Sequence, residues 1–235
     1  MSPKKKQSKA EAQKTERVIQ YAGIAMIVVV VALIASPYIA KLYPKAGVVQ
    51  DPENKAACAV FDSIPAAERY DEAPPMRIDP SKQYFATFKM EKGGAFKAEL
   101  YPAKAPLTVN SFVFLACKDF FDGVTFHRVL EGFMAQGGDP SGTGAGGPGY
   151  QFANEDSDLV FDKAGVLAMA NAGRDTNGSQ FFITFGPQES LNGGYTIFGQ
   201  VVEGMDVVNG ITRRNPEQSP AFEGDAIQTI VVETR

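Results

Sequence analysis

Hydrophobic residues follow two different patterns along the chain. Near the amino terminus, residues 18–35 read VIQYAGIAMIVVVVALIA, an almost unbroken apolar run in which only Gln20 and the hydroxyl of Tyr21 are polar. A helix rises about 1.5 Å per residue, so this run, continued to Ala40, is long enough to span the ~30 Å hydrocarbon core of a bilayer. The pattern therefore predicts a membrane-spanning helix over residues 18–40.

Charged residues flank this apolar run unequally. Residues 1–17 contain six Lys or Arg against two Glu, whereas the near carboxyl-terminal flank offers only Lys41 and Lys45. Because the cytoplasmic flanks of membrane helices carry the excess of Lys and Arg, we expect a basic cytoplasmic leader at 1–17. The protein is thus predicted to cross the membrane once and to hold its folded part on the extracytoplasmic side.

Two other interpretations of the apolar run remain open. A cleaved secretory signal would release the protein, but its apolar core is normally only ~7–15 residues long and ends in small residues at a cleavage site. Here the core is longer, and Pro37 follows directly after Ala35 and Ser36. A buried helix of a soluble protein is disfavoured by the basic leader and by the polar segment that follows.

Residues 41–82 are rich in Pro, Ala, Lys, Asp and Glu and show little periodicity apart from a short apolar patch around Val60 and Phe61. This composition predicts a stalk or linker, partly ordered at most. Cys58 lies within it. On an oxidising side of the membrane Cys58 could pair with Cys117 or with a second chain, and an unpaired thiol is an equally open alternative.

From residue 83 to 235 the apolar pattern changes to short runs separated by Gly, Pro, Asn and Asp, which is typical of a sandwich or barrel. The clearest strand-like runs read QYFATFKM, AFKAELY, VTFHRVL, GVLAMA, SQFFITF, YTIFGQVV and IQTIVVET. Helical spacing occurs over residues 109–116, after the start signals Pro106 and Thr108, and more weakly over residues 205–211. The pattern predicts a mainly β domain of seven or eight strands, closed into a barrel whose ends are covered by two helices.

Composition narrows the chemistry that this domain can perform. The 235-residue chain has one His, two Cys and no Trp, so a His-rich zinc site and a Ser-His-Asp hydrolase are both hard to build. Its net charge of −4 provides no electrostatic footprint for nucleic acid. A chain of this length allows one well-buried domain and some accessory segments.

Four short sequence motifs carry more specific information than the periodicity does. They read FHRV at 126–129, GFMAQGGD at 132–139, GVLAMANAG at 165–173 and TNGSQFFIT at 176–184. In order and spacing they resemble the signature of the cyclophilins, and the resemblance covers essentially all of residues 83–235. It implies a closed eight-stranded antiparallel barrel capped by two helices, and a peptidyl-prolyl cis/trans isomerase that needs no cofactor.

The resemblance also implies a role for individual residues. Arg128 matches the catalytic position of the family. The residues that match the proline pocket are Phe133, Met134, Phe182 and Leu191, and those that match the positions holding the substrate backbone are Gln136, Ala170, Asn171 and Gln180. Neighbours on a strand point to opposite faces, so we expect Phe181 in the core if Phe182 lines the pocket, and a structural role for His127 beside Arg128.

Two positions depart from the family pattern. Ser190 stands where many members carry a Trp whose indole donates a hydrogen bond, which predicts weak binding of cyclosporin. Tyr195 stands where many members carry His, and it keeps a flat apolar face with one polar tip, so we count it among the substrate-binding residues. Residues 142–147 read GTGAGG, but Pro148 and Gly149 follow where a nucleotide-binding helix would begin, which favours a flexible loop beside the groove.

These residue types suit rotation about an Xaa-Pro bond. Amide resonance gives a barrier of ~18–20 kcal/mol, and as the bond twists the prolyl nitrogen gains a lone pair that a fixed guanidinium can stabilise. The sequence therefore predicts an enzyme that acts on proline-containing polypeptide clients and accelerates the folding of extracytoplasmic proteins. A membrane-tethered module or chaperone that binds proline segments with little catalysis is the alternative, and Arg128 together with Gln136 favours the enzyme. A barrel with an internal small-ligand cavity is disfavoured by the bulky apolar residues on the strands.

Overall fold

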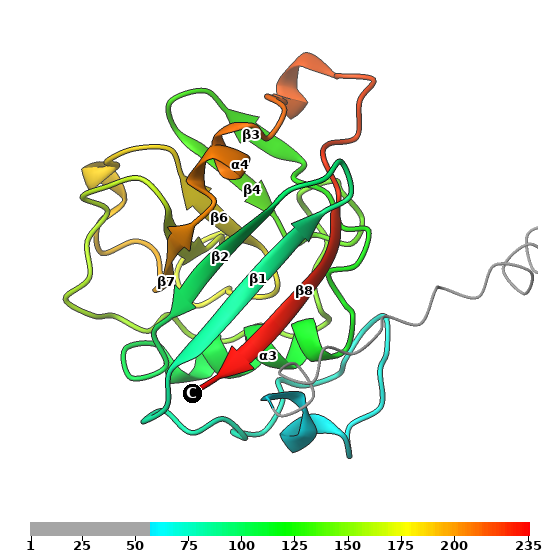
Figure 1. Ribbon diagram of the computed structural model, residues 1–235, viewed down its shortest axis with the longest axis vertical. Coiled ribbons are helices and arrows are strands. Elements are labelled where there is room, and N and C mark those ends of the chain that lie inside the picture. Colours follow the sequence, from blue (N-terminus) through cyan, green and yellow to red (C-terminus); the bar gives the residue numbers. More distant parts are fainter. Residues whose placement is uncertain (1–56) are drawn as a thin grey trace, which may run out of the picture. The chain divides into compact units, whose positions relative to one another are not determined.

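Eight strands form one antiparallel sheet in the computed structural model, which describes residues 57–235 (Figure 1). The strands are β1 Tyr84–Met90, β2 Ala95–Leu100, β3 Arg128–Leu130, β4 Met134–Gly137, β5 Val166–Met169, β6 Phe181–Thr184, β7 Ile197–Glu203 and β8 Ile227–Thr234. Their order in the sheet is β3-β4-β6-β5-β7-β2-β1-β8. The two helices are α3 Pro106–Cys117 and α4 Met205–Asn209, and the 3-10 turns are η1 Ala59–Phe61, η2 Glu189–Leu191 and η3 Pro216–Gln218.

The two ends of this sheet, β3 and β8, are bridged next to the strands and do not share a continuous ladder. Gly123 donates its backbone N–H to the carbonyl of Ile227, Ile227 donates to Val124, and Phe126 donates to Asp225, all between 2.8 and 2.9 Å. The architecture is therefore a half-barrel whose edges meet through one short segment. The predicted barrel of eight antiparallel strands is therefore confirmed as a half-barrel and not in its closed form, since β3, which is three residues long, does not pair with β8.

Each of the seven predicted runs contains an observed strand, and both predicted helices are present. Helix α3 includes residues 109–116 and begins at Pro106, and α4 ends at Asn209 with Gly210 as its C-cap, so these predictions are confirmed. Strand β4 was not among the predicted runs. It is four residues long and reads MAQG, so it offers no apolar alternation to detect.

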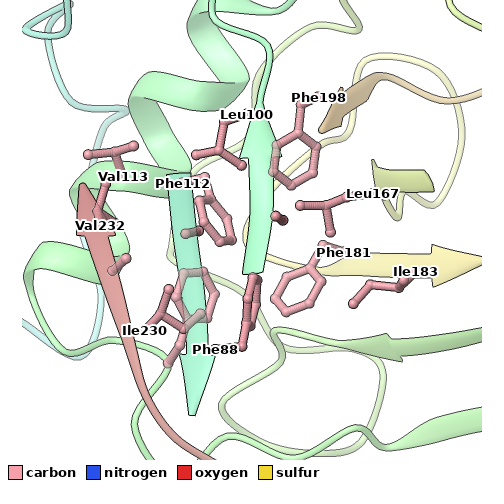
Figure 2. Close-up of a cluster of buried hydrophobic side chains, with 14 of the residues drawn as sticks. Phe88, Leu100, Phe112, Val113, Leu167, Phe181, Ile183, Phe198, Ile230 and Val232 are labelled. Carbon is pink, nitrogen blue, oxygen red and sulfur yellow. The ribbon is translucent and has the colours of Figure 1, made fainter. Parts of the chain in front are cut away.

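Phenylalanine rings fill the interior of the half-barrel. Strand alternation buries Tyr84, Ala86, Phe88 and Met90 on one face of β1, and the ring of Phe88 stacks on that of Phe96 at 4.5 Å and meets that of Phe181 edge-on at 5.7 Å. Figure 2 shows Phe88 and Phe181 gathered with Phe112 and Phe198 in this core cluster. Each fully buried Phe contributes roughly 1.5–3 kcal/mol. A packed interior does not support the small-ligand barrel.

Helix α3 is buried on both of its faces. Every residue from Thr108 to Ala116 is buried. One face packs on the barrel through Phe112, whose ring centroid lies 5.9 Å from that of Phe181. The opposite face is covered by residues 57–82, which we call the N-terminal strap (Figure 1).

The strap is attached to α3 at both of its ends. Cys58 forms a disulfide with Cys117, and the fully buried ring of Phe61 lies 5.4 Å from that of Phe114. Near the other end, the Asn110 side-chain oxygen accepts the backbone N–H groups of Arg77 (2.9 Å) and Ile78 (3.3 Å). Residues 57–82, which were predicted as part of the stalk, are thus held on the barrel by buried side chains, hydrogen bonds and the disulfide.

The part of the chain that the structure describes contains no helix long and apolar enough to cross a membrane. The predicted leader 1–17, the predicted spanning helix 18–40 and the first part of the predicted linker lie outside the described residues.

Candidate active site

A pocket of about 140 Å³ opens on the outer face of β4 and β6. Nine of the ten residues that the sequence singled out line it: Arg128, Phe133, Met134, Gln136, Ala170, Asn171, Phe182, Leu191 and Tyr195. They come from β3, β4 and β6, from the turn between β3 and β4, from the chain after β5, from η2 and from the segment before β7. Segments more than 60 residues apart in the sequence thus contribute to one concave surface.

Strand alternation separates this pocket from the main core. On β4 and β6, Ala135, Phe181 and Ile183 point into the half-barrel, whereas Met134 and Phe182 belong to a second apolar cluster on the other face. The Phe182 ring stacks on that of Phe161 at 5.7 Å, and the Tyr195 ring meets it edge-on at 5.5 Å. The prediction that Phe181 is a core residue is confirmed, and the pocket floor is apolar.

A row of polar side chains runs along the rim of this floor. Register places Arg128 opposite Gln136, and Gln136 opposite Phe182, on three adjacent strands. Arg128 Nη1 donates to Gln136 Oε1 at 3.5 Å, and Gln136 Nε2 donates to Gln180 Oε1 at 2.9 Å. The row ends on residues 142–147, which we call the glycine-rich loop. Gln180 Nε2 donates to the carbonyls of Gly144 (3.0 Å) and Gly146 (2.9 Å) in this loop.

Arg128 presents its charge to the pocket. Its guanidinium carbon lies 5.9 Å from the centroid of the Phe133 ring, within the range of a cation–π contact. Within residues 57–235, no carboxylate forms an ion pair with Arg128. A half-buried cation without a paired carboxylate can still interact with a partially negative group on a ligand.

A second, larger cavity of about 730 Å³ adjoins the pocket and shares Gln136, Ala170 and Asn171 with it. Gln180, the tenth predicted residue, lines this cavity. Residues 144–151 form much of its wall, so the loop predicted from GTGAGG does lie beside the groove. Arg69 of the strap lines it too, which no pattern in the sequence indicated.

The glycine-rich loop is fixed from the inside by Asp139, a fully buried carboxylate. One oxygen accepts the backbone N–H and hydroxyl of Ser141, both at 2.7 Å, and the other accepts the N–H groups of Gly144 (2.7 Å) and Gly146 (3.1 Å). Burial disfavours its charged form, but these hydrogen bonds outweigh burial and lower the pKa of Asp139. An ionised carboxylate thus holds the loop whose carbonyls orient Gln180.

His127 is buried and does not line either cavity. Burial is the main cause that lowers the pKa of His127, so its imidazole is neutral near pH 7. The structural role predicted for it agrees with this position under the glycine-rich loop, where a Cβ on Gly144 would lie 3.7 Å from its Nε2.

Comparison with known proteins adds an independent line of evidence. The family model described as cyclophilin type peptidyl-prolyl cis-trans isomerase matches residues 85–232. Peptidyl-prolyl cis-trans isomerase B of Bacillus subtilis is 46% identical over 138 residues, which are 58% of this chain and 96% of the relative. Peptidyl-prolyl cis-trans isomerase-like 1 of Homo sapiens is 46% identical over 153 residues, which are 63% of this chain and 90% of the relative.

A solved structure is also similar to this chain. The crystal structure of a Cryptosporidium parvum cyclophilin type peptidyl-prolyl cis-trans isomerase in the presence of the dipeptide Ala-Pro has a TM-score of 0.57 and 33% sequence identity. The match covers 64% of this chain and 99% of that one.

Proposed function

The chain belongs to the cyclophilin-type peptidyl-prolyl cis-trans isomerases and is an enzyme of that class, and from this premise we propose that Arg128 stabilises the twisted Xaa-Pro amide. One observation carries the proposal. A cation without an ion-pair partner among the described residues stands at the rim of an apolar pocket and is oriented by Gln136.

The size and lining of the pocket suit a proline ring. An apolar protein cavity of about 150 Å³ is large enough to hold a benzene ring, and the pocket here measures about 140 Å³. With the ring held against Phe133, Met134 and Phe182, the residue before proline is the part of the substrate that swings. The ring then stays fixed while the amide rotates.

The chemistry requires no bond to break. As the amide twists, conjugation is lost and the prolyl nitrogen gains a lone pair, so a guanidinium nearby interacts more strongly with the transition state than with either planar isomer. Lowering the ~18–20 kcal/mol barrier by about 7 kcal/mol would accelerate rotation about 10⁵-fold. Gln136, Ala170 and Asn171 line both cavities and Gln180 lines the larger one, where they can hold the substrate backbone in register.

Cyclosporin is expected to bind weakly. Ser190 is exposed in η2, next to the pocket residue Leu191, and cannot supply the indole N–H that many family members offer at this position. A titration of the protein with cyclosporin, followed by inhibition of peptide isomerisation, measures this directly.

The isomerase is proposed to work on the extracytoplasmic side of a membrane, tethered by residues 18–40, and to act there on the folding of proline-containing clients. The apolar run and its basic leader support this placement. The Cys58–Cys117 disulfide supports it as well, because such bonds persist mainly in oxidising compartments.

Trapping the thiols in intact cells tests this placement. Acid quenching followed by alkylation should leave both cysteines unmodified unless the sample is first reduced. Protease added outside the cytoplasmic membrane should also digest the domain. Two alkylated cysteines without reduction, together with protection from the protease, would place the domain in the cytoplasm.

Isomerisation of an Xaa-Pro peptide tests the role of Arg128. We expect the full-length chain in non-ionic detergent to accelerate the reaction, and Arg128→Ala to lower kcat by about 10²–10³, the usual effect of removing one preorganised donor. Arg174→Ala is the matched control, since Arg174 is exposed and lines neither cavity.

A folded Arg128→Ala variant that keeps its rate to within threefold would show that another group stabilises the transition state. A wild-type protein that binds the peptide without accelerating it would instead favour the tethered binding module.

A further inference from the structure

Among residues 57–235, the larger cavity next to the proline pocket has a single charged lining residue. Of the described residues that line it, most are glycine, alanine or uncharged polar residues, and only Arg69 is charged. Arg69 belongs to the N-terminal strap, outside the matched residues 85–232. The strap therefore contributes a charged side chain to a cavity that is otherwise built by the barrel.

The backbone on both sides of Arg69 is fixed. The backbone N–H of Ala67 donates to the hydroxyl of Tyr70 at 3.1 Å, which closes a short turn around Arg69. The N–H of Tyr70 donates to the carbonyl of Pro148 at 2.7 Å, and the Tyr70 ring meets that of Phe114 edge-on at 4.8 Å. Arg69 is thus held beside residues 147–151 of the cavity wall, between two hydrogen-bonded neighbours.

Close approach of the strap to this wall depends on a glycine. Gly149 has a φ of +104°, and a Cβ placed on it would lie 2.3 Å from the carbonyl oxygen of Tyr70. No other residue type fits there without displacing the strap. The position of Arg69 at the rim is therefore a built feature of the fold.

The charge of Arg69 is available to a ligand. Its side chain is exposed, and within residues 57–235 it forms no ion pair. The acidic neighbours Glu68 and Asp71 do not line the cavity. An acidic side chain that enters the cavity would meet this guanidinium and no carboxylate among the described lining residues.

We propose that Arg69 is a specificity-determining residue that favours clients with an acidic side chain close to the Xaa-Pro bond. The inference rests on the proposed seating of proline in the smaller pocket. Because the two cavities share Gln136, Ala170 and Asn171, a peptide with its proline in one must extend a neighbouring side chain toward the other. The preference is modest, about two- to fivefold in kcat/KM, because Arg69 is solvated.

Matched peptides test this. The peptides are hexapeptides with acetylated and amidated ends and one Ala-Pro bond. At each remaining position in turn, one peptide carries Glu and its partner carries Gln. The value of kcat/KM for each is measured from cis/trans exchange by NMR, with the full-length chain in non-ionic detergent. In at least one position the Glu peptide should be favoured two- to fivefold. The ratio should approach one in Arg69→Gln, fall below one in Arg69→Glu, and shrink as salt is raised from about 50 to 500 mM.

Arg77→Gln is the matched control. It removes the same charge from the same strap, at a residue that is exposed and lines neither cavity, so it should keep the wild-type ratio. The proposal is overturned if no position shows a Glu preference above about 1.5-fold, or if Arg69→Gln retains it.

Arg128→Ala, measured on the same peptides, separates the two proposals. It should lower kcat/KM for Glu and Gln peptides equally. If Arg128→Ala keeps its rate, the catalytic assignment fails while the Glu/Gln ratio still decides the role of Arg69.

Discussion

Phe61 offers the sharpest test of whether the strap belongs to the folded domain. Its side chain is fully buried in the main core cluster and packs against the ring of Phe114. Truncating a buried Phe to Ala typically costs 3–5 kcal/mol, from lost burial and from the cavity left behind. For a domain of this size each kcal/mol lowers Tm by roughly 2–4 °C, so Phe61→Ala should lower it by about 6–20 °C.

The neighbouring residue supplies the control. Val60 is 42% exposed, so Val60→Ala should change the free energy of unfolding by no more than about 0.5 kcal/mol. Thermal unfolding followed by circular dichroism compares the two variants with wild type, and hydrogen exchange of α3 shows whether its outer face becomes exposed. Equal Tm values for both variants, with unchanged exchange in α3, would refute the description of the strap as part of the core.

Two further predictions concern the groups that hold the strap and the loop. Replacing both Cys58 and Cys117 by Ser removes a cross-link between residues 59 positions apart, which should cost about 4 kcal/mol and make Tm insensitive to reductant, whereas reductant should lower the Tm of the wild type. Asp139 has a lowered pKa in the folded state, so its contribution to stability is complete above the unfolded pKa of about 3.9 and is lost as pH falls through the folded value. Asp139→Asn should therefore be less stable near pH 7, and its Tm deficit should narrow below about pH 4. A constant deficit across that range would contradict the assignment.

Hydrophobic periodicity predicted the strands and helices in which burial repeats at the strand or helix period. Alternation in β1 and β2 follows the inward and outward faces, and Pro106 marks the start of α3. The four sequence motifs contain seven of the nine pocket residues, because those seven are clustered in short segments, and Leu191 and Tyr195 follow the last motif. Strand β4 lies inside one of these motifs, yet its four residues are too few to show a period.

The strap escaped prediction because long-range contacts, and no regular repeat, hold it in place. Asn110 binds the backbone of Arg77 and Ile78, 33 and 32 residues away, and such pairings leave no mark on local composition. The sequence of α3 did contain one indication that a further segment covers this helix. Residues 112–116 read FVFLA and are apolar on every face, which is typical of a helix buried all round. That helix needs a second covering layer.

Asp139 and the strap both bind the chain in and directly after the glycine-rich loop. Asp139 binds the N–H groups of Gly144 and Gly146 from within, whereas Tyr70 binds the carbonyl of Pro148 from the strap. Glycine-rich loops lose much conformational entropy on ordering, so contacts at both ends are needed to keep the carbonyls that orient Gln180 in place. We therefore expect the polar row toward Arg128 to depend in part on the strap, which precedes the barrel.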